Sequence, residues 1–109
     1  ITVSVTIDSS RAQRYDSSWP SSMGSRTVTL SEGATVYDAL CAMGVSVGGS
    51  SYYVSSINGL AEKACGGTSG WTYSVDGTYP NKACGRYVLS GGETVRWVYS
   101  TDADPTISY

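Results

Sequence analysis

The sequence SGWTYSVDG at residues 69–77 is the stretch from which the fold class of this chain can be argued most directly. Its large apolar side chains, Trp71, Tyr73 and Val75, alternate with small polar ones. Alternation with a period of two places the apolar side chains on one face of an extended segment, the pattern of a half-buried β-strand. The dipeptide Asp76-Gly77, which favours tight turns, closes the stretch. Residues 69–77 therefore predict a strand with one buried face that ends in a turn.

Other stretches predict the neighbouring strands. The clearest begins the chain, where Ile1, Val3, Val5 and Ile7 alternate strictly with threonine and serine. Further strands are predicted from their β-branched and aromatic residues at residues 26–30, 52–57, 86–89 and 94–99.

One helix is predicted, starting after Thr35. Thr35 supplies an N-cap, and Asp38, three residues on, completes a pair that resembles a capping box. Apolar side chains then recur at helical spacing, on Val36, Ala39, Leu40 and Met43. Gly44 is a natural C-cap. Cys41 lies at the edge of the apolar stripe, so we expect it to be a small buried hydrophobe.

The remaining segments are predicted to be connections. Residues 8–24 form a polar, serine-rich loop, and loops of this length in compact domains are often functional. Trp19 within it is either an anchor folded back onto the core or an exposed aromatic for a ligand. Residues 45–51, rich in glycine and serine, predict a loop, and residues 60–64 predict a single helical turn. The tail from about residue 101 is expected to be frayed.

These elements predict an α+β fold, a β-grasp-like mixed sheet with one helix packed on one face. A β-sandwich with an incidental helix is the alternative. A chain of 109 residues is long enough for one modest core and too short for two, so residues 1–109 are predicted to form a single domain.

Composition and charge argue against several classes of function. A formal net charge of −2 offers no basic face for nucleic acid. No apolar run approaches the roughly 20 residues that span a bilayer, so no membrane insertion is expected. The chain shows no signal peptide and starts without methionine, and we interpret it as an excised or processed module.

The lack of histidine excludes several kinds of catalytic and metal site. Ser-His-Asp and Cys-His nucleophilic sites cannot form within a chain that has no histidine. Histidine-containing zinc sites are excluded as well, and the three cysteines show no C-x-x-C pairing. We therefore expect no catalytic residues, no metal site and no cofactor.

Three cysteines is an odd number, so at least one has no partner within the chain. Cys65 and Cys84 both sit beside glycine, in turn-like segments on either side of the 69–77 strand. A Cys65–Cys84 disulfide would close a loop of about 20 residues and contribute roughly 3 kcal/mol, and it would imply an oxidising compartment. The alternative is three reduced thiols in a cytosolic protein.

Several segments together resemble the transcobalamin-like C-terminal domain family of bacterial surface and secreted proteins. Residues 35–40 (TVYDAL) resemble the start of that family's helix, and residues 53–60 (YVSSINGL) resemble its strand and turn. Residues 69–77 resemble its most distinctive motif, with Asp76 in place of the usual asparagine. Residues 79–81 and 92–99 are similar to its closing segments, so the resemblance runs in order from about Thr27 to Tyr99.

The resemblance implies a β-grasp-like fold and, because bacterial members often carry cysteines near these positions, it supports the Cys65–Cys84 pair. In the animal cobalamin carriers of the family, the strand that matches Trp71, Thr72 and Tyr73 contacts the bound corrinoid. These carriers have a separate helical domain that completes the site, and no helical segment of that size exists here.

Aromatic side chains are the remaining candidates for binding, since the chain has 9 Tyr, 3 Trp and no Phe. Some must replace phenylalanine in the core. Others, near Trp71 and Tyr79, could stack on a corrinoid, a sugar or an apolar patch of a partner. We therefore expect Trp71, Thr72, Tyr73 and Tyr79 to bind ligand.

The sequence thus predicts a non-catalytic extracellular or cell-wall-associated binding module of a bacterial surface or secreted protein. Its ligand is cobalamin-like or another small molecule, or its partner is a surface protein. A structural spacer or adhesion domain without a small-molecule site is the alternative.

Overall fold

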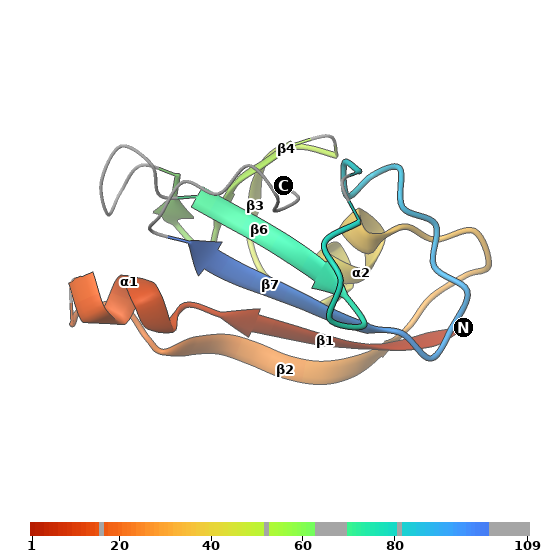
Figure 1. Ribbon diagram of the computed structural model, residues 1–109, viewed down its shortest axis with the longest axis horizontal. Coiled ribbons are helices and arrows are strands. Elements are labelled where there is room, and N and C mark those ends of the chain that lie inside the picture. Colours follow the sequence, from red (N-terminus) through yellow and green to blue (C-terminus); the bar gives the residue numbers. More distant parts are fainter. Residues whose placement is uncertain (16, 52, 63–69, 81, 101–109) are drawn as a thin grey trace.

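The computed structural model describes residues 1–15, 17–51, 53–62, 70–80 and 82–100 (Figure 1). The elements in chain order are β1 (Thr2–Asp8), α1 (Ser10–Tyr15), β2 (Ser22–Thr29), α2 (Val36–Ala42), β3 (Val47–Ser50), β4 (Tyr53–Ile57), β5 (Leu60–Ala61), β6 (Gly70–Val75) and β7 (Thr94–Ser100).

The strands form two sheets. The larger sheet has the order β2-β1-β7-β6, and the smaller has the order β3-β4-β5. In the larger sheet β1 is antiparallel to β2 and parallel to β7, while β6 is antiparallel to β7. The first and last strands of the described chain therefore lie side by side at the centre of a mixed sheet. The predicted α+β fold with a mixed sheet is confirmed.

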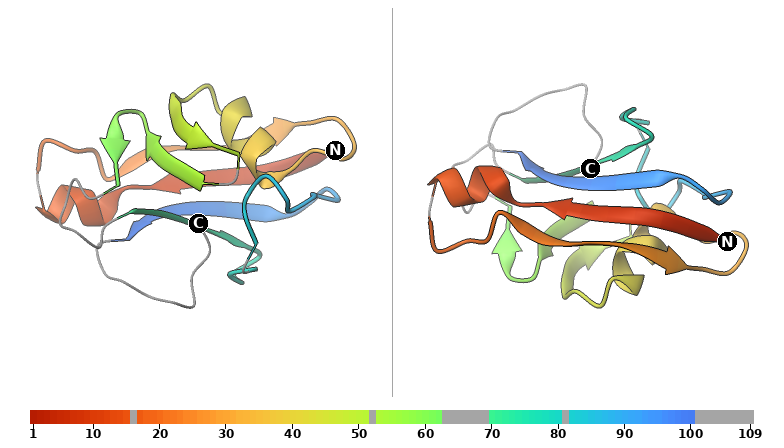
Figure 2. Two further views of the ribbon diagram at one scale, coloured as in Figure 1. Left: turned by 90° about the horizontal axis from the view of Figure 1, so that it is seen from above. Right: turned by 90° about the horizontal axis from the view of Figure 1, so that it is seen from below.

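The core lies on one face of the four-stranded sheet. Figure 2 shows α2 and the small sheet on the same side of it. The indole Nε1 of Trp71 on β6 donates a hydrogen bond to the Leu60 carbonyl of β5 at 2.8 Å. The Tyr99 hydroxyl on β7 donates to the Ala61 carbonyl at 2.7 Å. These two bonds fix the end of the small sheet to the inner face of the large one.

Burial confirms the period-two pattern of β1, and that of β7 from Thr94 to Tyr99. In β6 the apolar side chains are buried as predicted, but Thr72, predicted to lie on the more exposed face, is buried as well. The inward side chains of the sheet are all nearly inaccessible to solvent, and they are Val3, Val5, Ile7, Trp71, Tyr73, Val75, Val95, Trp97 and Tyr99. Cross-strand neighbours meet as aromatic pairs, with Trp71 opposite Tyr99 and Tyr73 opposite Trp97. Both pairs have ring centroids 5.2 Å apart, a separation at which aromatic rings attract each other.

The helix predicted after Thr35 is α2, and its start is confirmed in detail. The Thr35 hydroxyl oxygen accepts a hydrogen bond from the Asp38 amide, and the Asp38 carboxylate accepts one from the Thr35 amide at 2.9 Å. The helix ends at Ala42 with Met43 as its C-cap, one residue before Gly44. Cys41 is exposed on it, so the expectation of a buried Cys41 was wrong.

The polar segment 8–24 is more ordered than predicted. It contains α1, whose Ala12 is fully buried, and β2 begins within it at Ser22. The carboxylate of Asp8 accepts a hydrogen bond from the Ser10 amide at 2.9 Å, at the start of the helix. Trp19 is partly buried and packs against the core, which agrees with the anchor interpretation.

Three further predictions of local structure were wrong. Residues 47–50 form β3 instead of a loop, and Leu60–Ala61 form β5 instead of a helical turn. In the predicted strand at residues 86–89, Val88 makes only an isolated bridge with Thr35. The predicted frayed tail lies outside the described residues. Among the residues described, no helix combines the length and apolar character needed to cross a membrane.

Candidate functional site

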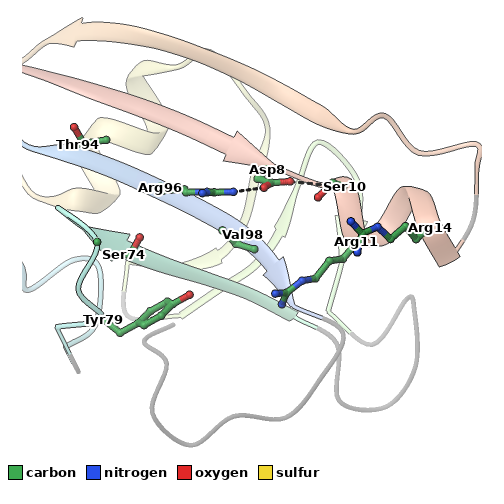
Figure 3. A pocket seen from close by; sticks show the side chains of 10 residues that line it. Asp8, Ser10, Arg11, Arg14, Ser74, Tyr79, Thr94, Arg96 and Val98 are labelled. Atoms are coloured by element: carbon green, nitrogen blue, oxygen red, sulfur yellow. Dashed lines mark hydrogen bonds and ion pairs between the residues drawn. The ribbon is translucent and has the colours of Figure 1, made fainter.

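The face of the four-stranded sheet opposite the core carries a cavity of about 600 Å³ (Figure 3). This volume lies within the range of small-molecule sites. We call it the outer cavity, and it is lined by Asp8, Ser10, Arg11, Arg14, Ser74, Gly77, Tyr79, Thr94, Arg96 and Val98.

Strand β7 supplies the floor of the outer cavity. Because successive side chains of a strand point to opposite faces, burying Val95 and Trp97 in the core turns Thr94, Arg96 and Val98 outward. The neighbouring strands contribute Ser74 from β6 and Asp8 from the end of β1 by the same alternation. The floor is therefore polar, with Val98 as its apolar part.

A tight turn positions Tyr79 at the edge of the cavity. Asp76 and Gly77 both adopt positive φ angles, of 50° and 83°, and Val75 and Thr78 exchange two backbone hydrogen bonds across them. The Asp76 carboxylate accepts a hydrogen bond from the Thr94 amide at 2.9 Å, which ties the turn to the start of β7. Tyr79 follows this turn and lines the cavity, and its side chain is 40% exposed.

Helix α1 closes another side of the cavity with two arginines. Arg11 and Arg14 are three residues apart and so lie on neighbouring positions of the helix surface. Figure 3 shows Arg11 reaching from α1 toward β7. The buried Ala12 holds α1 against the rest of the domain, so the helix has a fixed place beside the sheet.

An ion pair between Asp8 and Arg96 crosses the floor at 2.5 Å. Partial burial of the Asp8 carboxylate raises its pKa, but hydrogen bonds from Ser10 and the charge and hydrogen bond of Arg96 outweigh that effect. The pKa of Asp8 therefore lies below its ordinary value. Asp8 is a carboxylate at neutral pH, and it is already engaged by protein groups.

Asp8→Asn is expected to lower the free energy of unfolding at pH 7 by about 0.5–1 kcal/mol, the range for a partly exposed ion pair. Because the pKa of Asp8 is lower in the folded state, its stabilisation is fully present above the unfolded-state pKa and is lost as the pH falls through the folded-state pKa. Urea unfolding should therefore separate variant and wild type at pH 7 and show them converging at about pH 2. The matched control is Glu32→Gln, an exposed carboxylate in a turn. A gap between wild type and Asp8→Asn that persists at low pH would contradict this origin.

The structure separates the four residues predicted to bind ligand. Trp71, Thr72 and Tyr73 are each exposed by 1% or less. Their side chains are engaged internally: Thr72 donates to the Val98 carbonyl at 3.0 Å, and the Tyr73 hydroxyl donates to the Lys82 carbonyl. Burial gives no support to direct ligand contacts by these three residues. Only Tyr79 lines the outer cavity.

Of the two cysteines in the predicted Cys65–Cys84 disulfide, Cys65 lies outside the described residues and Cys84 is described. Cys84 is a buried free thiol whose Sγ donates to the Ser51 carbonyl at 3.3 Å. Burial raises the pKa of Cys84 to about 11, so it is protonated at neutral pH. The disulfide finds no support in these features and stays a prediction.

Sequence reasoning missed most of the residues around the outer cavity. Asp8, Arg11 and Arg14 fall in the segment predicted to be a polar loop, and Arg96 falls on a predicted strand. The signal available was the outward register of Thr94, Arg96 and Val98, which alternate with the predicted core residues of the same strand. Within the described residues, no three His, Cys, Asp or Glu side chains cluster in a way that could hold a metal ion.

The topology defines this chain as a small α+β domain built on a mixed four-stranded sheet. The chain belongs to the family described as Domain of unknown function (DUF4430), whose profile matches residues 33–101. No curated protein sequence matches it. Among solved structures, it is similar to a crystal structure described as a "putative metal binding protein" from Ruminococcus gnavus. The TM-score is 0.60 with 11% sequence identity, and the match covers 91% of this chain and 95% of that one, so the fold is shared.

Proposed function

We propose that this domain is a non-catalytic binding module of a bacterial cell-surface or secreted protein, and that the outer cavity is its small-molecule site. The observation that carries the proposal is the cavity itself, a concave region of about 600 Å³ on the open face of the sheet. Hydroxyl, guanidinium and aromatic groups converge on it from four separate elements or turns. Ligand sites combine apolar and aromatic side chains with a few placed polar groups; Tyr79 and Val98 supply the former here, in a lining that is otherwise mostly polar.

The non-catalytic part of the proposal is supported by the composition of the chain. It has no histidine, and Asp8, the one carboxylate among the described residues that line the cavity, is held ionised by Arg96 and Ser10. A general acid or base needs a pKa near the working pH, and the pKa of Asp8 is shifted in the opposite direction.

A cobalamin-like ligand remains one form of this proposal, supported by the resemblance to the transcobalamin-like C-terminal domain. The location outside the cell rests on the same resemblance. The name of the Ruminococcus gnavus neighbour suggests a metal ion as another ligand. The outer cavity does not suit a metal ion, because its described lining holds three arginines and one carboxylate, and arginine repels cations.

The test is a titration of ¹⁵N-labelled protein with cobalamin and with a fragment set of neutral, acidic and basic members. At least one compound should shift the amide signals of Ser74, Tyr79 and Thr94 in a saturable way. Tyr79→Ala should weaken that binding about 5- to 30-fold, the loss of roughly 1–2 kcal/mol of aromatic contact. The matched control is Tyr15→Ala, a tyrosine that is 65% exposed on α1 and is not part of the cavity lining. A set of compounds that shifts no cavity residue would overturn the proposal.

A structural spacer is the second candidate. It is favoured by the burial of Trp71, Thr72 and Tyr73, the strand residues expected to face a ligand. Under this alternative the same titration leaves every cavity signal in place.

A further inference from the structure

The outer cavity is a positively charged region on a chain with negative net charge. Among the residues that the structure describes, Arg11, Arg14 and Arg96 contribute three positive charges to its lining and Asp8 contributes one negative charge, which gives these residues a summed charge of +2. The whole chain has seven Lys and Arg residues against nine Asp and Glu, a formal net charge of −2. Three of the seven basic residues therefore gather around one cavity.

Asp8, the one carboxylate among the described lining residues, does not neutralise all three arginines. Asp8 pairs with Arg96 and also accepts the Ser10 amide, so its oxygens are occupied. No ion pair joins Arg11 or Arg14 to another residue in the described part of the chain. Two guanidinium groups on α1 thus border the cavity without an internal counter-charge among the residues described.

Guanidinium groups are well suited to oxyanions. Each presents several N–H donors in a planar fork that matches the oxygens of a carboxylate, sulfate or phosphate. The hydroxyls of Ser74 and Thr94 add neutral donors on the floor. Tyr79 and Val98 supply an aromatic and an apolar surface in the same cavity. The cavity therefore offers cationic donors on the α1 side and an apolar contact beside β6 and β7 (Figure 3).

From this arrangement we infer that the outer cavity binds a small ring-containing molecule that carries an oxyanion. The oxyanion lies against Arg11 and Arg14, and the ring lies against Tyr79. This inference rests on the proposed function, since it assigns the ligand class of the same site. Arg96 is held by Asp8 and contributes mainly to the field in the cavity.

Four sugars of similar size and different charge test the inference. Glucose 6-phosphate and glucuronic acid carry an oxyanion, glucose is neutral, and glucosamine is cationic. Each is titrated into ¹⁵N-labelled protein while the amide signals of Tyr79 and Thr94 and the side-chain Nε–Hε signals of arginine are followed. At least one of the two anionic sugars should shift these signals saturably, at least tenfold more tightly than glucose or glucosamine. Comparing the phosphate with the carboxylate identifies which oxyanion is preferred.

Variants then locate the oxyanion. The double change Arg11→Gln and Arg14→Gln removes two charges from an exposed helix surface, and it should weaken binding of the preferred anionic sugar roughly tenfold or more. Asp8→Asn should strengthen binding of that sugar, because it removes the negative charge that Asp8 contributes to the lining. The matched control is Arg26→Gln on β2, an exposed arginine outside the cavity that donates to the Ala42 carbonyl at 3.1 Å. This control should leave the affinity within twofold.

The titrations distinguish a cavity that binds oxyanions from a cavity that binds small molecules without regard to charge. Equal shifts with glucose, glucosamine and the anionic sugars would overturn the oxyanion inference and leave the outer cavity as the binding site. An arginine double variant that binds as tightly as wild type would overturn the oxyanion inference in the same way. If none of the four sugars shifts a cavity residue, the oxyanion inference is overturned, while the proposed function fails only if cobalamin and the fragment set also leave the cavity signals unchanged.

Discussion

Trp71→Ala is expected to lower the free energy of unfolding by about 3–5 kcal/mol, enough to leave a domain of this size barely folded. Trp71 is 1% exposed and packs edge-to-face on Tyr99, with ring planes 72° apart. Its indole also joins the two sheets through the bond to Leu60. Removing it opens a large cavity and leaves a buried carbonyl without its donor. Urea unfolding followed by far-ultraviolet circular dichroism measures the loss.

A pair of smaller substitutions separates the hydrogen bond from the packing. Trp71→Phe and Trp97→Phe both replace a buried indole on neighbouring strands, and each indole faces a tyrosine across the sheet. Among the described residues, Trp97 Nε1 has no hydrogen-bond partner, whereas Trp71 Nε1 has one. Trp71→Phe should therefore cost about 1–2 kcal/mol more than Trp97→Phe. Equal losses for the two variants would show that the bond to Leu60 does not stabilise the joint between the sheets.

Gly49→Ala is expected to lower the free energy of unfolding by about 2–4 kcal/mol, the sum of backbone strain and overpacking. Gly49 has a φ of +94°, and an added Cβ would lie 2.8 Å from the Ser55 amide nitrogen and closer still to the Tyr53 carbonyl oxygen. Both atoms belong to the backbone of β4, so they cannot move aside without breaking the β3–β4 pairing.

The matched control for this change is Gly33→Ala. Gly33 has a similar φ of +83°, but no atom lies within 4 Å of its added Cβ. It should lose only about 1 kcal/mol, the cost of the backbone conformation alone. Thermal unfolding compares the two variants, and hydrogen exchange at the β3 amides shows whether the small sheet opens first. A Gly49→Ala variant as stable as Gly33→Ala would contradict the close approach of Gly49 to the backbone of β4.

Local patterns in the sequence predicted the large sheet and α2 because each residue's role there depends on its near neighbours. The alternation around Trp71 and Trp97 marks one buried face, and the Thr35–Asp38 capping box spans three residues. The same alternation, however, cannot distinguish a core aromatic from one that faces a ligand. The ligand contacts predicted for Trp71 and Tyr73 came from the surplus of aromatic residues and from the resemblance, whereas both residues are buried in the core.

The elements that sequence reasoning missed depend on distant partners. Helix α1 has six residues, too few for a stable isolated helix, and it is held by the buried Ala12 and by the Asp8 carboxylate. Strand β3 contains two adjacent glycines, which disfavour an isolated strand, and it forms through pairing with β4. The outer cavity combines residues as far apart as Asp8 and Arg96, so only the register between β1 and β7 could bring them together.

The parallel pairing of β1 with β7 also has a mechanical consequence. Ser4 to Asp8 pair with Thr94 to Val98 in the same direction, so five residue pairs join the first and last strands. Tension applied to the chain before β1 and after β7 pulls these strands past each other along their length. The hydrogen bonds of the central ladder then share the load and rupture together instead of opening one by one. The β1–β7 pairing therefore makes the domain resist extension along the line that joins these two strand ends.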